Sequence, residues 1–258
     1  MLPPPALPPL YAHRLGRAYG PDSSAAALRG ALAGGPLAGV ETDVCLTADG
    51  DLVCLHDPLL GIGTTLEGWA HERSAAAICN GRLRDATGAP TSERPLRLGD
   101  LLELVAGSEL GVQVEIKAHA DSALARRTAA TLCDRYRGHP ARKGMEVLSF
   151  HADACAIAAA HGFRARLVAW ADYTPEALAA WAVRHGIFGV ALEHFMLSAS
   201  LVRPLRLAGL SVTVGTVNRI ELLERSLAFA PDAVCTDRPH ELRAEWASRQ
   251  ALAAGAAA

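Results

Sequence analysis

Long hydrophobic runs are missing from this sequence of 258 residues. No apolar stretch reaches the roughly 20 residues that a helix needs to cross a bilayer, which argues against stable membrane insertion. The first residues, MLPPPALPPLYAHR, also lack the basic start and apolar helix of a secretory signal. These two absences predict a cytoplasmic location.

An excess of charge of either sign is also missing. The chain has 25 basic and 27 acidic side chains, so its formal net charge is −2. Without a net positive field, it cannot hold nucleic acid or an anionic membrane by bulk attraction. Any anion must therefore be bound locally, which predicts a small-molecule partner and leaves homo-oligomerisation open.

Closely spaced cysteines are missing as well. The six cysteines stand singly, with no C-x-x-C pair and no tight spacing to a pair of histidines. This pattern argues against zinc sites and disulfides, and favours buried small residues or free thiols.

What the sequence does contain is a regular alternation of short apolar runs and segments of helical period. The predicted strands are 7–12, 37–44, 111–116, 145–150, 165–170, 187–192, 210–217 and 232–235. The predicted helices are 24–33, 98–106, 122–136, 152–160, 175–184, 199–207, 219–229 and one after Pro239. Helix starts are expected at Asp22-Ser23, Thr174-Pro175 and Asp237. Eight strand–helix units in a chain of this length predict a (β/α)8 TIM barrel, with a doubly wound open sheet as the alternative.

We expect residues 1–258 to form a single domain with a short insertion after the second strand. The repeat is broken between His56 and Pro95, where only a weak helix at 67–78 is expected. Asp49-Gly50 predicts a hairpin turn before this stretch. The insertion, at about residues 57–95, is expected to lie over the active face, since long irregular segments are usually functional.

Candidate metal ligands stand where predicted strands end, which is the productive face of a barrel. Alternation places Glu41 and Asp43 on one side of their strand, and Glu115 and Lys117 on one side of theirs. Each carboxylate alone is as readily explained by a salt bridge, but three together would repel one another without a cation. Oxygen ligands favour Mg²⁺ or Ca²⁺, and the sequence does not distinguish them.

Two histidines, His13 and His56, follow strand ends beside these carboxylates. Either one alone would be read as a hydrogen-bonded structural residue. Flanking a metal site, however, two imidazoles suit a phosphodiester displacement, which needs one group to take a proton and another to give one. Arg14 and Lys117 would then bind the phosphate oxygens.

Weaker candidates follow the later strands. Thr216 and Asn218 end the seventh predicted strand, and Asp237-Arg238 end the eighth, in a region where barrels often bind phosphate. Trp170 ends the fifth predicted strand and could line the pocket or pack as an ordinary aromatic residue.

These motifs, in this order, resemble those of the glycerophosphodiester phosphodiesterase family. The matching segments are His13-Arg14, Glu41-Thr42-Asp43, the hairpin Leu46-Thr47-Ala48-Asp49-Gly50, His56-Asp57-Pro58-Leu59-Leu60, Glu115-Ile116-Lys117, Ser149-Phe150, Thr216-Val217-Asn218 and Thr236-Asp237-Arg238-Pro239. The resemblance runs from about residue 8 to residue 245. It implies a metal-dependent (β/α)8 barrel that hydrolyses glycerophosphodiesters to glycerol 3-phosphate and an alcohol. By the same correspondence, His13 and His56 are the acid/base pair, and Glu41, Asp43 and Glu115 bind the metal.

Three segments depart from the family pattern. Leu15-Gly16-Arg17 follows the H-R motif where the family has a glycine directly, and Pro21-Asp22-Ser23-Ser24 stands for its P-E-N-T. Gly215 replaces the tryptophan of W-T-V-N, so an aromatic wall is lost. Two alternatives therefore stay open: a phospholipase D-like lyase that releases a cyclic phosphate, and a catalytically silent phosphodiester-binding barrel.

Overall fold

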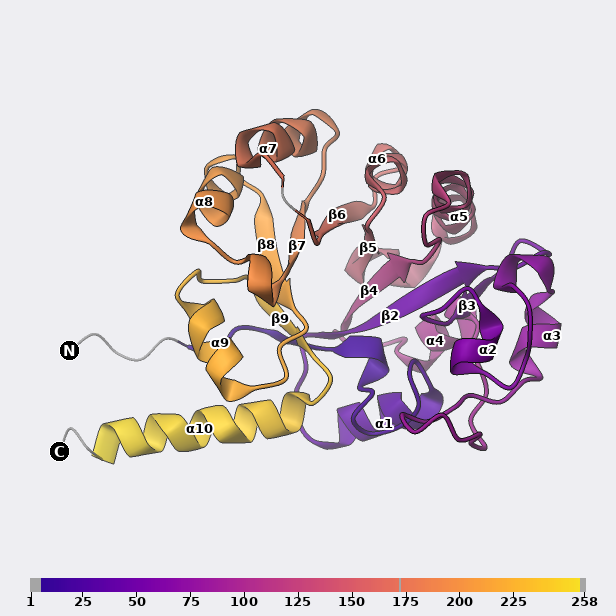
Figure 1. Ribbon diagram of the computed structural model, residues 1–258, viewed down its shortest axis with the longest axis horizontal. Helices are drawn as coiled ribbons and strands as arrows, with labels where there is room; N and C mark the ends of the chain where they lie inside the picture. The colour runs from indigo at the N-terminus through magenta and orange to yellow at the C-terminus, as the bar shows by residue number, and fades with distance from the viewer. Residues whose placement is uncertain (1–5, 172, 256–258) are drawn as a thin grey trace.

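A closed parallel barrel forms the centre of the molecule (Figure 1). The computed structural model describes residues 6–171 and 173–255, so the ends of the predicted domain, 1–5 and 256–258, lie outside the described residues. Within the described part, the sheet closes because β1 pairs in parallel with both β2 and β9. The barrel strands are β1 (Leu10–Ala12), β2 (Gly39–Leu46), β4 (Gly111–Ile116), β5 (Met145–Ser149), β6 (Arg164–Ala169), β7 (Gly189–Glu193), β8 (Ser211–Gly215) and β9 (Ala233–Thr236). The predicted (β/α)8 barrel is confirmed, and the open-sheet alternative is wrong.

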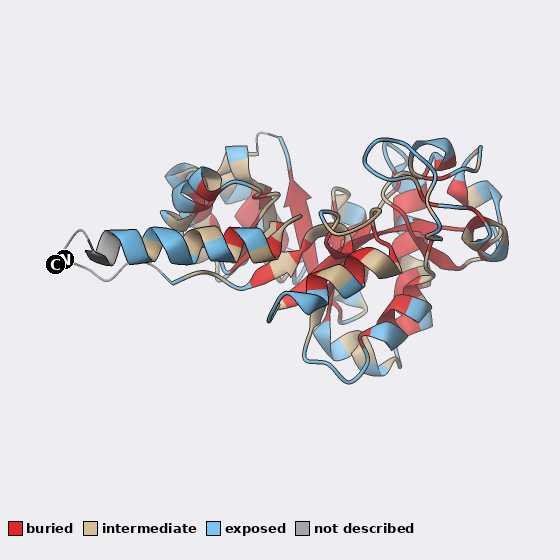
Figure 2. Cartoon of the chain, turned by 90° about the horizontal axis from the view of Figure 1, so that it is seen from below, coloured by how far each residue is buried: buried red, intermediate tan, exposed pale blue. Residues whose placement is uncertain are grey.

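Helices follow the barrel strands and surround them (Figure 1). They are α1 (Ala25–Ala33), α4 (Leu98–Leu104), α5 (Ser122–Tyr136), α6 (Ala152–Ala160), α7 (Pro175–Arg184), α8 (Ala199–Leu207), α9 (Ile220–Leu227) and α10 (Pro239–Gly255). Their outer faces are exposed, whereas the strands are almost entirely buried (Figure 2). No helix in the described part of the chain is both long and apolar enough to cross a membrane.

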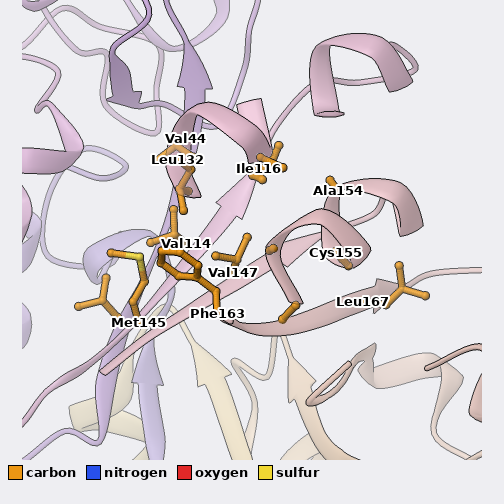
Figure 3. Close-up of a cluster of buried hydrophobic side chains, with 14 of the residues drawn as sticks. Val44, Val114, Ile116, Leu132, Met145, Val147, Ala154, Cys155, Phe163 and Leu167 are labelled. Carbon is orange, nitrogen blue, oxygen red and sulfur yellow. The ribbon is translucent and has the colours of Figure 1, made fainter. Parts of the chain in front are cut away.

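The main core lies between the strands and the helices. Val114 and Val147 point outward from β4 and β5 and pack in one cluster with Leu132 of α5 and Cys155 of α6 (Figure 3). The alternate residues of the same strands face the barrel interior, as strand pleating requires. One set of side chains therefore stabilises the fold, and the other set is free to build a site.

Two boundary predictions are corrected by local chemistry. Strand β1 begins at Leu10 and not at Leu7, because Pro8 and Pro9 have no N–H to extend the ladder. Helix α1 is capped by Ser24, whose side chain accepts a hydrogen bond from the Ala27 N–H at 3.0 Å. Asp22 and Ser23, the expected start signal, contact Arg14 instead: Asp22 pairs with its guanidinium, and the Ser23 N–H donates to its carbonyl oxygen at 2.9 Å.

The insertion begins with the predicted hairpin. Strand β3 (Leu52–Cys54) pairs antiparallel with β2 outside the barrel. The elements that follow are α2 (Leu60–Gly63), the 3₁₀ turn η2 (Ala70–Glu72) and α3 (Ala75–Cys79). The single weak helix expected at 67–78 is wrong, because Arg73 and Ser74 are extended and the Ser74 side chain caps a new helix at Ala77 N–H. A small core around Leu60 and Ile78 holds this segment.

A buried ion cluster closes the N-terminal end of the barrel. Glu146 of β5 accepts hydrogen bonds from Arg166 Nε and from Gln113 Nε2, both at 3.0 Å, and lies 2.6 Å from Arg164 Nη2. Arg166 is only 3% exposed, so its charge depends on Glu146 for compensation.

Replacing Glu146 by alanine is expected to lower the free energy of unfolding by about 3–5 kcal/mol, because the buried Arg166 would lose its partner. Urea denaturation measures this loss. The exposed pair of Asp134 with Arg137 supplies a control, since Asp134→Ala is expected to cost less than about 1 kcal/mol. Equal effects of the two substitutions would contradict a structural role for the cluster.

Candidate active site

Three buried carboxylates meet at the C-terminal end of the barrel. Asp43 of β2 is the direct register partner of Glu115 on β4, and Glu41 lies two residues before Asp43 on the same strand. One ligand atom from each of the three lies within 4.8 Å of the others. The sequence placed these side chains on common strand faces, and the parallel pairing of β2 with β4 brings them together.

Burial and mutual repulsion alter the titration of this triad. Burial, together with the charge of Asp43, raises the pKa of Glu41 to about 8. Burial also raises the pKa of Glu115, although Lys117 opposes the change. The pKa of Asp43 is lowered, because the charges of Lys117, His56 and Arg14 outweigh the effect of its burial. Asp43 is therefore the most strongly anionic member of the triad.

Two cations partly neutralise the triad. Lys117 Nζ lies 3.1 Å from Asp43 Oδ1 and contacts Glu115 Oε1, and Arg14 Nε lies 3.6 Å from Asp43 Oδ2. The salt bridges weighed as the simple alternative are thus present. They are insufficient, because among the described residues Glu41 Oε1 and Asp43 Oδ2 are buried without a hydrogen-bond donor. Orphaned carboxylate oxygens are the donor set that a hard divalent cation requires, so the residues present fit Mg²⁺ or Ca²⁺.

The loop after β1 turns back on the triad through the 3₁₀ turn η1 (His13–Leu15). Arg14 and Leu15 have φ values of 49° and 62°, in the left-handed region that non-glycine residues rarely adopt. This turn lets the Arg14 N–H donate to Glu41 Oε2 at 2.9 Å. The departure from the family at Leu15 is accommodated by full burial of its side chain.

His13 is held by an acidic partner from the other end of the chain. Its Nδ1 lies 2.6 Å from Asp237 Oδ1, while its Nε2 lies 3.8 Å from Glu41 Oε2. Asn218 Nδ2 donates to the second oxygen of Asp237 at 2.6 Å and so fixes that carboxylate. Burial lowers the pKa of His13, but the Asp237 hydrogen bond and the Glu41 charge outweigh it, so the pKa is raised.

His56 approaches the triad from the insertion side. Its Nδ1 lies 3.2 Å from Asp57 Oδ2. It lines a cavity of about 270 Å³ with Arg14 and the insertion residues Ile62 and Arg84. His13 lines a different cavity of about 70 Å³ with Glu41 and Glu115. The two histidines therefore belong to two cavities that adjoin the same group of charged residues.

Several residues have contacts that the sequence did not predict. Asp237, expected to begin a helix or lie near a phosphate, holds His13, and Arg238 Nη2 lies 2.5 Å from Glu245 Oε1 of α10. Asp22 lies 2.6 Å from Arg14 Nη1 and 3.0 Å from Arg17 Nε. Thr216 lines the cavity of His13. The one available signal for Asp237 was its place at the end of a strand, and its partner lies 224 residues away in the sequence.

The family match gives the class of enzyme to which this fold and site belong. The chain is a (β/α)8 barrel with three carboxylates, two cations and two histidines toward its C-terminal face, and its family model identifies it as a phosphoric diester hydrolase. The chain belongs to the glycerophosphoryl diester phosphodiesterase family, whose model matches residues 13–241. The resemblance seen in the sequence is confirmed.

Solved structures show the same fold. A Silicibacter pomeroyi protein assigned to the glycerophosphoryl diester phosphodiesterases is 22% identical, with a TM-score of 0.80 over 98% of this chain and 96% of that one. An Oleispira antarctica phosphodiesterase in complex with the product sn-glycerol-3-phosphate is 23% identical, with a TM-score of 0.80 over 92% and 96%. A glycerophosphodiester phosphodiesterase of Agrobacterium tumefaciens is 20% identical, with a TM-score of 0.75 over 92% and 100%. A comparison with curated proteins finds no match.

Proposed function

We propose that this single-domain enzyme hydrolyses small glycerophosphodiesters, such as the headgroup diesters left by phospholipid deacylation, to glycerol 3-phosphate and an alcohol. The observation that carries the proposal is the buried triad of Glu41, Asp43 and Glu115, whose oxygens lack enough protein partners. The family match and the product bound to the Oleispira antarctica structure support the substrate class.

A divalent cation held by the triad would supply Lewis-acid stabilisation of the phosphate charge. Lys117 and Arg14, already beside Asp43, would bind the non-bridging oxygens of the diester. Positive charge from these residues is needed because the triad alone would repel a phosphate.

His13 and His56 would manage the protons of the reaction. One histidine takes a proton from the attacking water as its oxygen bonds to phosphorus, and the other gives a proton to the alcohol oxygen as its bond to phosphorus breaks. His56 and His13 line different cavities, which would suit their acting on different oxygens of the diester.

The test is turnover of glycerophosphodiesters by the purified protein, with the products followed by phosphorus NMR. Glycerol 3-phosphate is expected. A cyclic phosphate would identify the lyase alternative, in which a neighbouring hydroxyl of the substrate attacks in place of water. Tight binding without any turnover in Mg²⁺ or Ca²⁺ would identify a silent binding protein and end the proposal.

Asp237 is expected to act as a positioning residue for His13. In Asp237→Asn, the amide no longer holds the His13 tautomer that presents Nε2 to the cavity, so kcat should fall by about 10- to 100-fold. The pKa of His13, raised in part by Asp237, should move down, and the limb of the pH–rate profile due to His13 should shift to lower pH. A lower kcat with an unmoved pH profile would contradict this role. His240→Asn, on a histidine that contacts Gly30 O away from the triad, serves as the control.

A further inference from the structure

A fourth carboxylate, Glu193, faces the cavity of His13. It ends β7 and is one of the residues that line this cavity of about 70 Å³ together with Glu41 and Glu115. It is not part of the group of three whose ligand atoms converge. No ion pair or hydrogen bond engages its carboxylate among residues 6–171 and 173–255. Glu193 is therefore a carboxylate at the rim of the site that forms no ion pair with any described residue.

The space beside Glu193 is opened by a glycine. Gly215 of β8 is the direct register partner of Glu193 and lines the same cavity. A Cβ atom at this position would lie 3.1 Å from Cys235 Cβ, so a larger residue would crowd the barrel wall. Because Gly215 has no side chain, nothing from that position covers the Glu193 side of the cavity.

Aromatic rings stand on the neighbouring strand ends. Ala169 pairs with Leu192, so Trp170 and Glu193 are the next residues along two adjacent strands. Trp170 is 58% exposed, and its ring lies 6.4 Å from that of Phe150 in an edge-on arrangement. The centroid of the Phe150 ring lies 5.3 Å from Lys117 Nζ. Through Lys117, the two rings are connected to the triad. An exposed indole on the strand end next to that of a carboxylate is a suitable surface for an organic cation.

We propose that Glu193 and Trp170 select diesters whose leaving alcohol carries an ammonium group. This proposal rests on the proposed hydrolase function. With the phosphate beside the triad, an alcohol that enters the cavity of His13 would place its ammonium toward Glu193, three bonds beyond the leaving oxygen. The leaving oxygen then lies on the side of His13, whose proton it would take as the bond to phosphorus breaks.

The charge of Glu193 explains why this arrangement would favour ammonium-bearing alcohols over neutral ones. A carboxylate near other carboxylates in a partly buried site is costly, and a substrate cation would relieve that cost where a neutral alcohol would not. A hydrogen bond between charged partners contributes more than one between neutral groups, so removing the charge of Glu193 should affect the two substrate classes differently.

The experiment compares kcat/KM for glycerophosphoethanolamine and glycerophosphocholine with kcat/KM for glycerophosphoglycerol, whose leaving alcohol is neutral. In Glu193→Gln, the ratio of ammonium-bearing to neutral substrate should fall by about 10-fold or more. In Trp170→Ala, the same ratio should fall by about 2- to 5-fold, and the fall should be larger for glycerophosphocholine, whose ammonium is quaternary, than for glycerophosphoethanolamine. Glu103→Gln, on an exposed residue of α4, should leave the ratio as in the parent.

Two outcomes would overturn the proposal. An equal loss of kcat/KM for all three diesters in Glu193→Gln would mean that this carboxylate serves the glycerol moiety. Unchanged kcat/KM values for all three would mean that it contacts neither the glycerol moiety nor the leaving alcohol. Calorimetric titration with Ca²⁺ distinguishes substrate selection from metal binding by Glu193. If Glu193 selects the substrate alone, the affinity for the ion should be the same in Glu193→Gln and the parent. Failure of the parent to hydrolyse any diester would instead overturn the hydrolase function.

Discussion

Replacing His13 by alanine is expected to lower kcat by about 10²- to 10⁴-fold, the usual contribution of a positioned acid or base. The loss follows from its geometry, since His13 lies beside Glu41, contacts Asp237 and lines the cavity that also contains Glu41 and Glu115. Steady-state kinetics with a glycerophosphodiester measures the effect. In the proposed role the imidazole would act on the reacting oxygens, so kcat should change far more than KM.

A matched histidine substitution controls for this experiment. His185 follows α7 and is exposed, so His185→Ala should retain the parent kcat. Circular dichroism and calcium affinity show whether the His13→Ala protein keeps its fold and its ion site. Full activity in a folded His13→Ala protein would remove this residue from the acid/base pair.

Removal of the divalent ion is expected to lower kcat by about 10³-fold or more, since a Lewis acid supplies several kcal/mol of stabilisation. Dialysis against EDTA, followed by assays with and without added Mg²⁺ or Ca²⁺, measures this loss and its reversal. Undiminished turnover in EDTA would exclude the metal role. Added ion should also raise the melting temperature, because it binds the folded state.

Glu41→Gln connects this ion site to stability. The pKa of Glu41 is raised to about 8 in the metal-free fold, so the folded protein binds a proton that the unfolded chain has lost. The metal-free parent should therefore lose stability as the pH rises from about 4.5 to about 8, and Glu41→Gln should show a weaker slope over this window. Denaturation in EDTA at several pH values tests the sign. The same substitution should weaken ion binding, which calorimetry reports independently of turnover.

The local pattern of the sequence was sufficient for the fold because each unit of the barrel repeats the same physical rule. Apolar β-branched runs predicted strands such as β4 and β5, and helical periodicity predicted α5 to α8 with little error at their ends. The secondary-structure prediction failed in the insertion, where a side-chain hydrogen bond and not the hydrophobic pattern decided where a helix begins. The insertion helix expected at 67–78 was divided by the capping of Ser74.

The candidate metal ligands could also be predicted from the sequence. Glu41, Asp43, Glu115 and Lys117 stand at positions whose alternation puts them on the inner side of a barrel, and burying charged groups is costly unless they are paired. The number and oxygen chemistry of the three carboxylates therefore favoured a hard cation as the expected ligand.

Only the tertiary structure decided which residues support the site from a distance. Strand pleating specifies the face of a side chain, but barrel closure specifies its neighbours, and β1 meets β9 only when the sheet closes. Closure brings Asp237 to His13, and the register of β8 on β7 sets Glu193 beside Gly215. These contacts depend on strand register across the whole barrel, which no local segment encodes. The sequence by itself therefore determined the barrel and its charged residues, and the closed sheet decided how those residues divide the site into two cavities.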